Sequence, residues 1–160
     1  MDGFAPGEGG CVLLLASEDA LHKNKLSSLA RIYHGVCADE PGHRFSDEPY
    51  KGDGLSEAIT KALVPLEQKQ VQTVFAGFNG ENFFAKEWGV AYLRNHDSFV
   101  DNLRIEHPAD CYGDLGAATG LLLTGLAAIG MQKKYVKEPC LIFCSSEKEK
   151  RGAVCMIPSE

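Results

Sequence analysis

The stretch HPADCYGDLGAATGLLLTGLAAIG, His107 to Gly130, decides how the fold is interpreted. Its polar, turn-rich opening runs into an uncharged segment, Leu115 to Met131. That segment is shorter than the roughly 20 apolar residues of a membrane span, and it contains threonines and glycines. We therefore predict a buried core helix from Leu115 to about Lys133. Asp114 is expected to cap this helix, because a carboxylate at that position accepts hydrogen bonds from free amides and complements the positive helix end.

The composition is that of an ordinary globular domain. The 160 residues are 44% hydrophobic and 24% charged, which is sufficient for a single domain spanning residues 1–160 with its own core. The net charge is −6, and no basic run of the kind that follows phosphates is present. We therefore expect neither nucleic acid nor an anionic membrane surface as a partner. The first ten residues lack the features of a signal peptide, so a cytoplasmic location is expected.

Six cysteines are scattered through the chain without a CxxC pair. This pattern is typical of reduced thiols in a cytosolic protein and gives little support to a structural zinc site. Cys140 and Cys144 would share one face of a strand and could gather with Cys155, but core packing is the simpler interpretation. His107 and Cys111 are also four residues apart, in a loop without a second ligand pair. We expect no bound metal.

Hydrophobic periodicity predicts strands alternating with helices. The expected strands are Cys11–Ser17, residues 28–39, 71–77, 102–107, 140–146 and 152–158; the expected helices are residues 55–66, 81–95 and 115–133. The first two strands could pair antiparallel, and Glu40–Gly54 is expected to be a long loop. The order implies right-handed crossovers and a mainly parallel sheet whose terminal strands add antiparallel edges.

Two segments carry a family resemblance, DGFAPGEGG at Asp2–Gly10 and YGDLGAATG at Tyr112–Gly120. The first is similar to the mid-chain DGFxxGEGxG segment of beta-ketoacyl synthases, which belong to the thiolase-like superfamily. The second is similar to the IGHTEAAAG segment of the same family. The resemblance covers nearly the whole chain but only the C-terminal half of a ketosynthase. It implies an α/β thiolase-like half: a mixed, mainly parallel five-stranded sheet with helices packed on it, one of them long and buried.

The resemblance also implies where the family's chemistry would lie. Ketosynthases use a cysteine and two histidines. The cysteine belongs to the N-terminal half, which this sequence lacks, so the 160 residues are either a natural chain or an excised half of a longer protein. The first histidine position corresponds to Gly77, the second to Asp114, and a lysine position to Ala109. The glycine-rich turn that lines the family's site corresponds to SEKEKR, residues 146–151. A carboxylate repels an oxyanion, so condensation is not expected.

Three residues remain candidates for ligand binding: Asn79, Cys111 and Asp114. Each has a structural alternative. FNGEN around Asn79 is typical of a turn before a helix, Asp114 of a helix cap, and Cys111 of an ordinary loop thiol. Glu87 corresponds to a structural acid of ketosynthases, and Trp88, the sole tryptophan, is expected in the core.

These observations lead to a hypothesis and two alternatives. The chain is predicted to be a non-catalytic ketosynthase-like domain of fatty acid or polyketide synthesis that binds an acyl-thioester, an acyl carrier protein or another protein, as chain-length factors do. Alternatively, it is an active acyltransferase whose cysteine lies in the absent half, or a structural dimerisation or secretion-system accessory module. No cofactor is expected. A lone half would expose an apolar face, so we expect pairing with its own N-terminal half or with a second copy.

Overall fold

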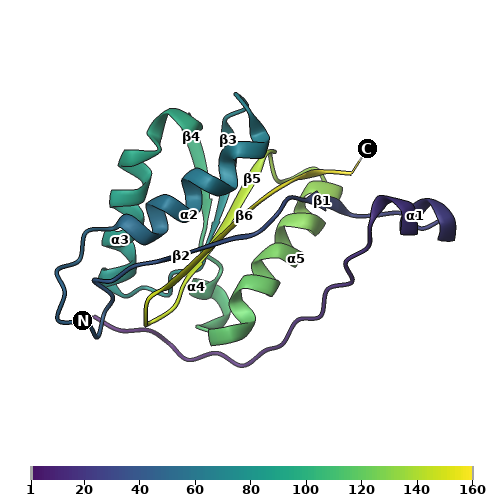
Figure 1. The fold of residues 1–160 in the computed structure, drawn as a ribbon. Coiled ribbons are helices and arrows are strands. Elements are labelled where there is room, and N and C mark those ends of the chain that lie inside the picture. The colour runs from purple at the N-terminus through teal and green to yellow at the C-terminus, as the bar shows by residue number, and fades with distance from the viewer. Residues whose placement is uncertain (1, 160) are drawn as a thin grey trace.

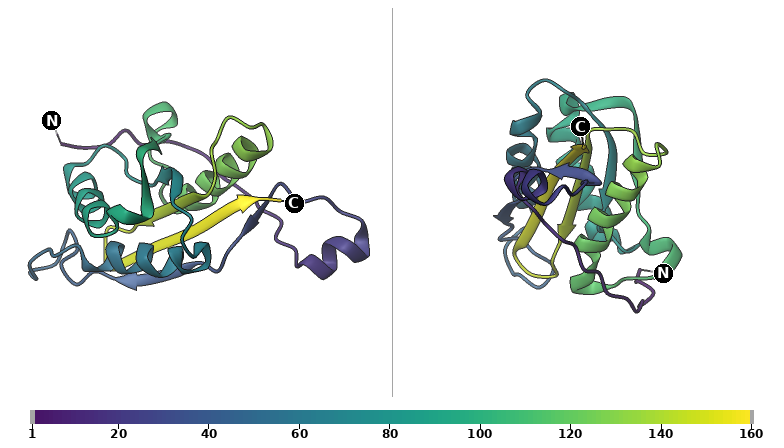
Figure 2. Two further views of the ribbon diagram at one scale, coloured as in Figure 1. Left: turned by 90° about the horizontal axis from the view of Figure 1, so that it is seen from above. Right: turned by 90° about the vertical axis from the view of Figure 1, so that its right-hand side faces the viewer.

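The computed structural model describes residues 2–159 as one mixed sheet with helices on both faces (Figures 1 and 2). The strands are β1 (Ala30–Ile32), β2 (Val36–Asp39), β3 (Val71–Ala76), β4 (Phe99–Glu106), β5 (Cys140–Ser145) and β6 (Lys150–Pro158). The α-helices are α1 (Glu18–Asn24), α2 (Asp53–Leu63), α3 (Asn82–Arg94), α4 (Ala109–Tyr112) and α5 (Thr119–Gln132). Short 3₁₀ turns are η1 (Val64–Leu66), η2 (His96–Ser98) and η3 (Gly116–Ala118).

The strand order is β1-β6-β5-β3-β4, and β2 pairs with β6 beyond β1. β3 runs parallel to β4 and β5, whereas β6 runs antiparallel to β5, β1 and β2. Every strand except β6 therefore points in the same direction. Because β1 and β2 lie end to end along β6, the six strands fill five rows. The predicted mixed, mainly parallel α/β sheet is confirmed.

Two separate apolar clusters lie on the two faces of the sheet, because successive side chains of a strand point to opposite faces. Leu141 and Phe143 of β5 pack under α2 and α3, where Trp88 stacks on Phe143 with ring centroids 5.0 Å apart. Cys140 and Ile142 of the same strand pack under α5. Trp88 is thus a core residue, as predicted.

Helix α5 is apolar along its whole length, but only one side of it is buried. Leu123, Ala127 and Met131 contact the sheet, whereas Leu121 is 48% exposed and Ile129 40% exposed. An α-helix that is apolar all round is normally covered on every side. The expectation of a fully buried helix from Leu115 is therefore corrected: the helix begins at Thr119, and this chain covers half of it. No helix among residues 2–159 has the length and apolar character needed to cross a bilayer.

The prediction of a buried strand at Cys11–Ser17 is wrong. These residues form no strand, and Val12 and Leu14 are 95% and 89% exposed. Their apolar pattern suits a strand, but no neighbouring strand of this chain offers them hydrogen bonds. The expected strand over residues 28–39 is divided into β1 and β2, which both pair with β6, so the predicted pairing of the first two strands is also wrong.

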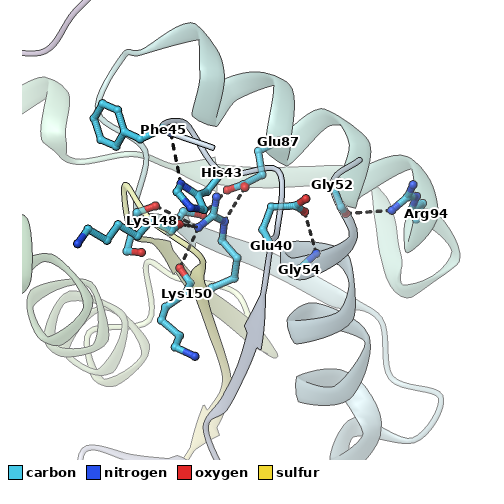
Figure 3. Close-up of polar contacts among 12 residues, drawn as sticks. Glu40, His43, Phe45, Gly52, Gly54, Glu87, Arg94, Lys148 and Lys150 are labelled. Atoms are coloured by element: carbon cyan, nitrogen blue, oxygen red, sulfur yellow. Dashed lines mark hydrogen bonds and ion pairs between the residues drawn. The ribbon is translucent and has the colours of Figure 1, made fainter. Parts of the chain in front are cut away.

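A buried ion pair connects α3 to the β5–β6 hairpin. Arg151 and Glu87 are both fully buried, and the Arg151 Nε donates to Glu87 Oε1 at 2.6 Å. The Ser145 hydroxyl donates to the second oxygen of Glu87, while burial raises the pKa of this carboxyl. The Arg151 Nη1 donates to three carbonyl groups of the hairpin turn, those of Ser146, Lys148 and Lys150 (Figure 3). The expected structural role of Glu87 thus has a specific partner.

The same region fastens the long loop, which runs from Glu40 to the start of α2 as expected. Glu40 is buried, and its Oε2 accepts a hydrogen bond from the amide of Gly54 at 2.9 Å (Figure 3). At the far end of the loop, Arg94 of α3 donates to the carbonyl of Gly52 at 2.9 Å. These bonds fix how α2 enters the fold.

We expect the substitution Arg151→Ala to lower the free energy of unfolding by about 3–5 kcal/mol, because it leaves the Glu87 carboxylate buried without a cation. Urea denaturation followed by the fluorescence of Trp88 measures this change. Arg104→Ala is the control, because Arg104 pairs with Glu106 at the surface and its loss should cost at most about 1 kcal/mol. Equal effects of the two substitutions would contradict the structural role of Arg151.

Candidate functional site

Gly77 and Asp114 correspond to the two histidine positions of the resemblance. Gly77 directly follows β3, and Asp114 lies just before η3. Asp114 is held there by side-chain hydrogen bonds: Asn79 Nδ2 donates to Asp114 Oδ2 at 2.7 Å, and the Gly116 amide donates to Asp114 Oδ1 at 2.7 Å. The predicted N-cap of the long helix is therefore wrong. The cap position of α5 is Ala118, and the Asp114 carboxylate instead closes the turn that precedes the helix.

Asn79 also organises the turn that leads into α3. Its Oδ1 accepts from the amide of Glu81 at 3.2 Å, and its Nδ2 lies 3.2 Å from Glu81 Oε2. Glu81 is only 3% exposed, and its other oxygen pairs with Arg44 of the long loop. The predicted turn at FNGEN is thus present. A continuous polar chain runs from Arg44 through Glu81 and Asn79 to Asp114.

The N-terminal residues form a strap across this site. The Asp114 amide donates to the carbonyl of Ala5, and the Gly7 amide donates to the carbonyl of Asp114, both at 2.8 Å. Gly113 has a φ of +82°, and a Cβ on it would lie 2.8 Å from the Ala5 carbonyl oxygen. Glycine is required at that position for both reasons. The Asp2 side chain accepts a further bond from the amide at the start of α3, that of Asn82.

Sequence reasoning did not identify Arg44 or Asp2 as members of this site. Both come from segments far from Asn79 and Asp114 in the chain, and neither carries a local pattern that indicates its partner. The motif resemblance of the first residues was the one available signal for Asp2, because Asp2 opens the segment that is similar to DGFxxGEGxG.

The space beside Gly77 is filled. A Cβ at this position would lie 2.7 Å from the Cys144 sulfur and 2.8 Å from the Phe143 carbonyl oxygen, to which the Gly77 amide already donates at 2.9 Å. A histidine side chain therefore has no room here unless β5 moves. Burial, and secondarily the charge of Asp114, raises the pKa of the Cys144 thiol to about 12. The thiol is protonated and poorly nucleophilic at neutral pH.

The structure brings Asn79 and Asp114 together but does not join Cys111 to them. Cys111 lies on α4 with Ala109, the lysine position of the resemblance, and its side chain is exposed. Within residues 2–159 no hydrogen bond connects Cys111 to Asn79 or Asp114. Nearby, His107 pairs with Asp110 at 2.8 Å and stacks on Phe78.

The cysteines do not gather into one site. Cys140 and Cys144 pack on the α5 side of the sheet, whereas Cys155 belongs to the cluster on the opposite face. In the described part of the chain, no three His, Cys, Asp or Glu side chains lie close enough together to hold a metal ion.

Among residues 2–159, the two family positions are occupied by Gly77 and Asp114. The carboxylates of Asp114 and Glu81 are engaged by Asn79, Arg44 and a backbone amide, and no histidine faces the site at either family position. What remains chemically is a set of polar groups beside a strand end and a helix N-terminus, where α/β folds often bind ligands.

Comparison with solved structures shows the fold of ketosynthases. The ishigamide ketosynthase/chain length factor matches with a TM-score of 0.83 and 14% identity over 99% of this chain and 45% of the matched chain. A ketosynthase bound to a hexaketide, from a type II polyketide synthase and in complex with its acyl-carrier protein, matches with a TM-score of 0.76 and 13% identity over 90% of this chain and 42% of the other. An oxazolomycin ketosynthase domain of Streptomyces albus JA3453 matches with a TM-score of 0.73 and 10% identity over 89% and 32%.

The chain thus spans less than half the length of these ketosynthase chains. The predicted thiolase-like fold, with 160 residues corresponding to a partial ketosynthase, is confirmed. No family model matches the sequence, and no curated protein matches it.

Gly77→Ala tests the packing at the first histidine position. We expect it to lower the free energy of unfolding by about 1–3 kcal/mol, because the new methyl group collides with the Cys144 sulfur and the Phe143 carbonyl. Gly89→Ala in α3 is the matched control, since a Cβ there meets open space and should stabilise the helix by up to about 1 kcal/mol. Urea denaturation of both variants decides; an unchanged Gly77→Ala protein would show that the site has room.

Alkylation tests the state of the thiols. At pH 8, iodoacetamide should modify the exposed Cys37 and Cys111 rapidly in the folded protein and leave Cys144 unmodified, because the pKa of Cys144 is about 12 and the thiol is shielded. Peptide mass spectrometry after a timed reaction measures the three rates. Rapid modification of Cys144 would mean that this thiol is accessible and activated.

Proposed function

We propose that this chain is a ketosynthase-like domain that binds an acyl carrier protein or its acyl-thioester and does not catalyse condensation. The observation that carries the proposal is the closed site: Cys144 occupies the space beside Gly77, and the Asp114 carboxylate is held by Asn79 and Gly116. A condensing site needs a base or donor aimed at the thioester carbonyl. Neither family position supplies one.

Electrostatics at Asp114 also oppose catalysis. Condensation develops negative charge on an oxygen, and an enzyme stabilises it with positioned donors. The donors nearest Asp114, the Asn79 amide and the Gly116 amide, are directed at the carboxylate itself. Asp114 therefore adds a negative charge to this region, and its carboxylate already binds the donors that an oxyanion would require.

The solved structures with this fold support a carrier-protein partner. One of them is a ketosynthase in complex with an acyl-carrier protein, and another is a ketosynthase paired with a chain length factor. A chain-length-factor-like role uses the fold for recognition instead of bond formation. We further propose that the ligand approaches near Asn79, Asp114 and the exposed Cys111, and that the protein works in the cytoplasm.

The competing candidate is an active acyltransferase whose nucleophilic cysteine comes from another half. It requires Asp114 or Asn79 to take a new role in proton transfer or carbonyl binding. Both residues are half-buried, and their present hydrogen bonds would first have to be broken, which costs about 1 kcal/mol for each bond. This cost favours the non-catalytic candidate.

The test combines binding with turnover. Isothermal titration of the full chain with a hexanoyl-loaded type II acyl carrier protein should give saturable binding. After incubation with malonyl-loaded and hexanoyl-loaded carriers, intact-mass analysis should detect no acylated protein, and no CO₂ should be released. Cys111→Trp should weaken binding at least tenfold, and Cys37→Trp, which alters an exposed cysteine on β2, should not.

Covalent acylation or CO₂ release would refute the non-catalytic role. Failure of both loaded and unloaded carrier proteins to bind at high micromolar concentration would refute the recognition role. Equal effects of the two tryptophan substitutions would move the binding surface away from Cys111.

A further inference from the structure

Two adjoining hollows lie at the C-terminal end of α5, whereas Asp114 precedes the N-terminal end of that helix (Figure 1). Their volumes are about 220 and 360 Å³, and together they reach the size of a small-molecule site. Val100, Asn102 and Arg104 line one side, because alternate residues of β4 share a face and α5 packs instead on β3, β5 and β6. We call this region the basic groove and define it by its polar lining, Gln72, Asn102, Arg104, Lys134, Tyr135 and Lys137.

Three cationic side chains gather in the basic groove, although the whole chain carries a net charge of −6. Within residues 2–159, the ammonium groups of Lys134 and Lys137 form no ion pair, in contrast to those of other lysines on the surface. Arg104 pairs with Glu106, and its Nη1 donates to the carbonyl of Tyr135 at 2.9 Å, which holds the guanidinium in place. A basic residue complements the C-terminal dipole of a helix, and this explains Lys134 but neither Lys137 nor Arg104.

Lys134 has a backbone conformation in which helices usually place glycine. It follows Lys133, the C-cap of α5, and its φ is +60°. A left-handed residue after a helix is most often glycine, because a side chain makes this conformation strained. Strained backbone is concentrated at ligand-binding sites. A ligand held by the Lys134 ammonium group explains why a lysine and not a glycine occupies this position.

We infer that the basic groove binds a nucleoside diphosphate, with its phosphate groups between Arg104, Lys134 and Lys137 and its base against Tyr135. Arginine and lysine are the side chains that bind phosphate oxygens most strongly. The Tyr135 ring contacts α5, where a Cβ on Gly130 would lie 3.1 Å from its Cε2 atom, and it remains 50% exposed for stacking.

Two further features of the groove bear on the choice of ligand. Three cations suit a diphosphate better than a single phosphate, which carries about two negative charges at neutral pH. Glu138 also lines the second hollow, and its carboxylate opposes an anion there. The groove lies at the opposite end of α5 from Asn79 and Asp114, so this inference is independent of acyl-carrier binding.

Isothermal titration of the full chain with ADP at low ionic strength should give saturable binding that weakens as salt is added. Lys134→Gly should weaken this binding about fivefold or more and at the same time raise the urea midpoint of unfolding, because glycine adopts the positive φ without strain. Glu138→Gln should tighten binding, because it removes the opposing charge. Lys86→Gln is the matched control, since Lys86 is exposed on α3, and it should change neither quantity.

Tyr135→Leu separates recognition of the base from recognition of the phosphates. It should weaken the binding of ADP about tenfold and leave the binding of inorganic pyrophosphate unchanged, because only ADP has a ring to stack. No ADP binding at millimolar concentration, ADP binding no tighter than that of inorganic sulfate, or a Lys134→Gly protein that binds ADP as tightly as the unaltered chain overturns the inference. Titration of the Lys134→Gly protein with the acyl carrier should give an unchanged affinity, which distinguishes failure at this groove from failure of the proposed function.

Discussion

The contact between the buried Arg151 guanidinium and the Glu87 carboxylate is the constraint around which the rest of the molecule is arranged. It connects α3 to the β5–β6 hairpin, and the same guanidinium binds the carbonyl groups of the hairpin turn. A buried cation is costly unless its charge and most of its hydrogen bonds are matched, and here the turn carbonyl groups satisfy Nη1 while Glu87 satisfies Nε. In ketosynthases, which this chain resembles, the corresponding turn is rich in glycine and lines the catalytic site. Here its carbonyl groups are committed to a structural cation.

The polar side chains near Gly77 are likewise hydrogen-bonded to one another. Asn79 binds both Asp114 and Glu81, and Glu81 also binds Arg44. The Gly116 amide donates a hydrogen bond to the second carboxylate oxygen of Asp114. Catalytic groups usually retain a free donor, acceptor or lone pair directed at the space where substrate reacts. Here the donors and acceptors of Asn79, Glu81 and Asp114 form hydrogen bonds with neighbouring residues. This arrangement supports the proposed recognition role.

The fold could largely be predicted because its central elements carry local patterns. Val71–Ala76 and Cys140–Ser145 are continuous apolar runs, and Trp88 and Ala91 share a helical face. The failures occurred where long-range partners decide the outcome. Cys11–Ser17 has the pattern of a strand but no adjacent strand, and Asp114 has the pattern of a cap but is drawn to Asn79 and Gly116.

The candidate site was predicted only in part for the same reason. Asn79 and Asp114 were identified separately, from their places after a strand and before a helix, and their direct contact could not be derived from spacing. Arg44 and Asp2 were missed because neither the salt bridge of Arg44 with Glu81 nor the hydrogen bond of Asp2 with the Asn82 amide leaves a local trace in the sequence. Cys111 was grouped with Asp114 by proximity in the chain, yet the turn at Gly113 directs the two side chains to different surroundings.

The strap at Ala5–Gly7 has a consequence for how the protein reaches its final form. Its hydrogen bonds with the backbone of Asp114 join residues more than a hundred positions apart, and the preceding Gly113 must already hold its positive φ for the strap to pass so close. Closing so long a loop carries a large entropic cost and is rewarded only once the sheet and η3 exist. The strap should therefore dock late in folding, after the core has formed.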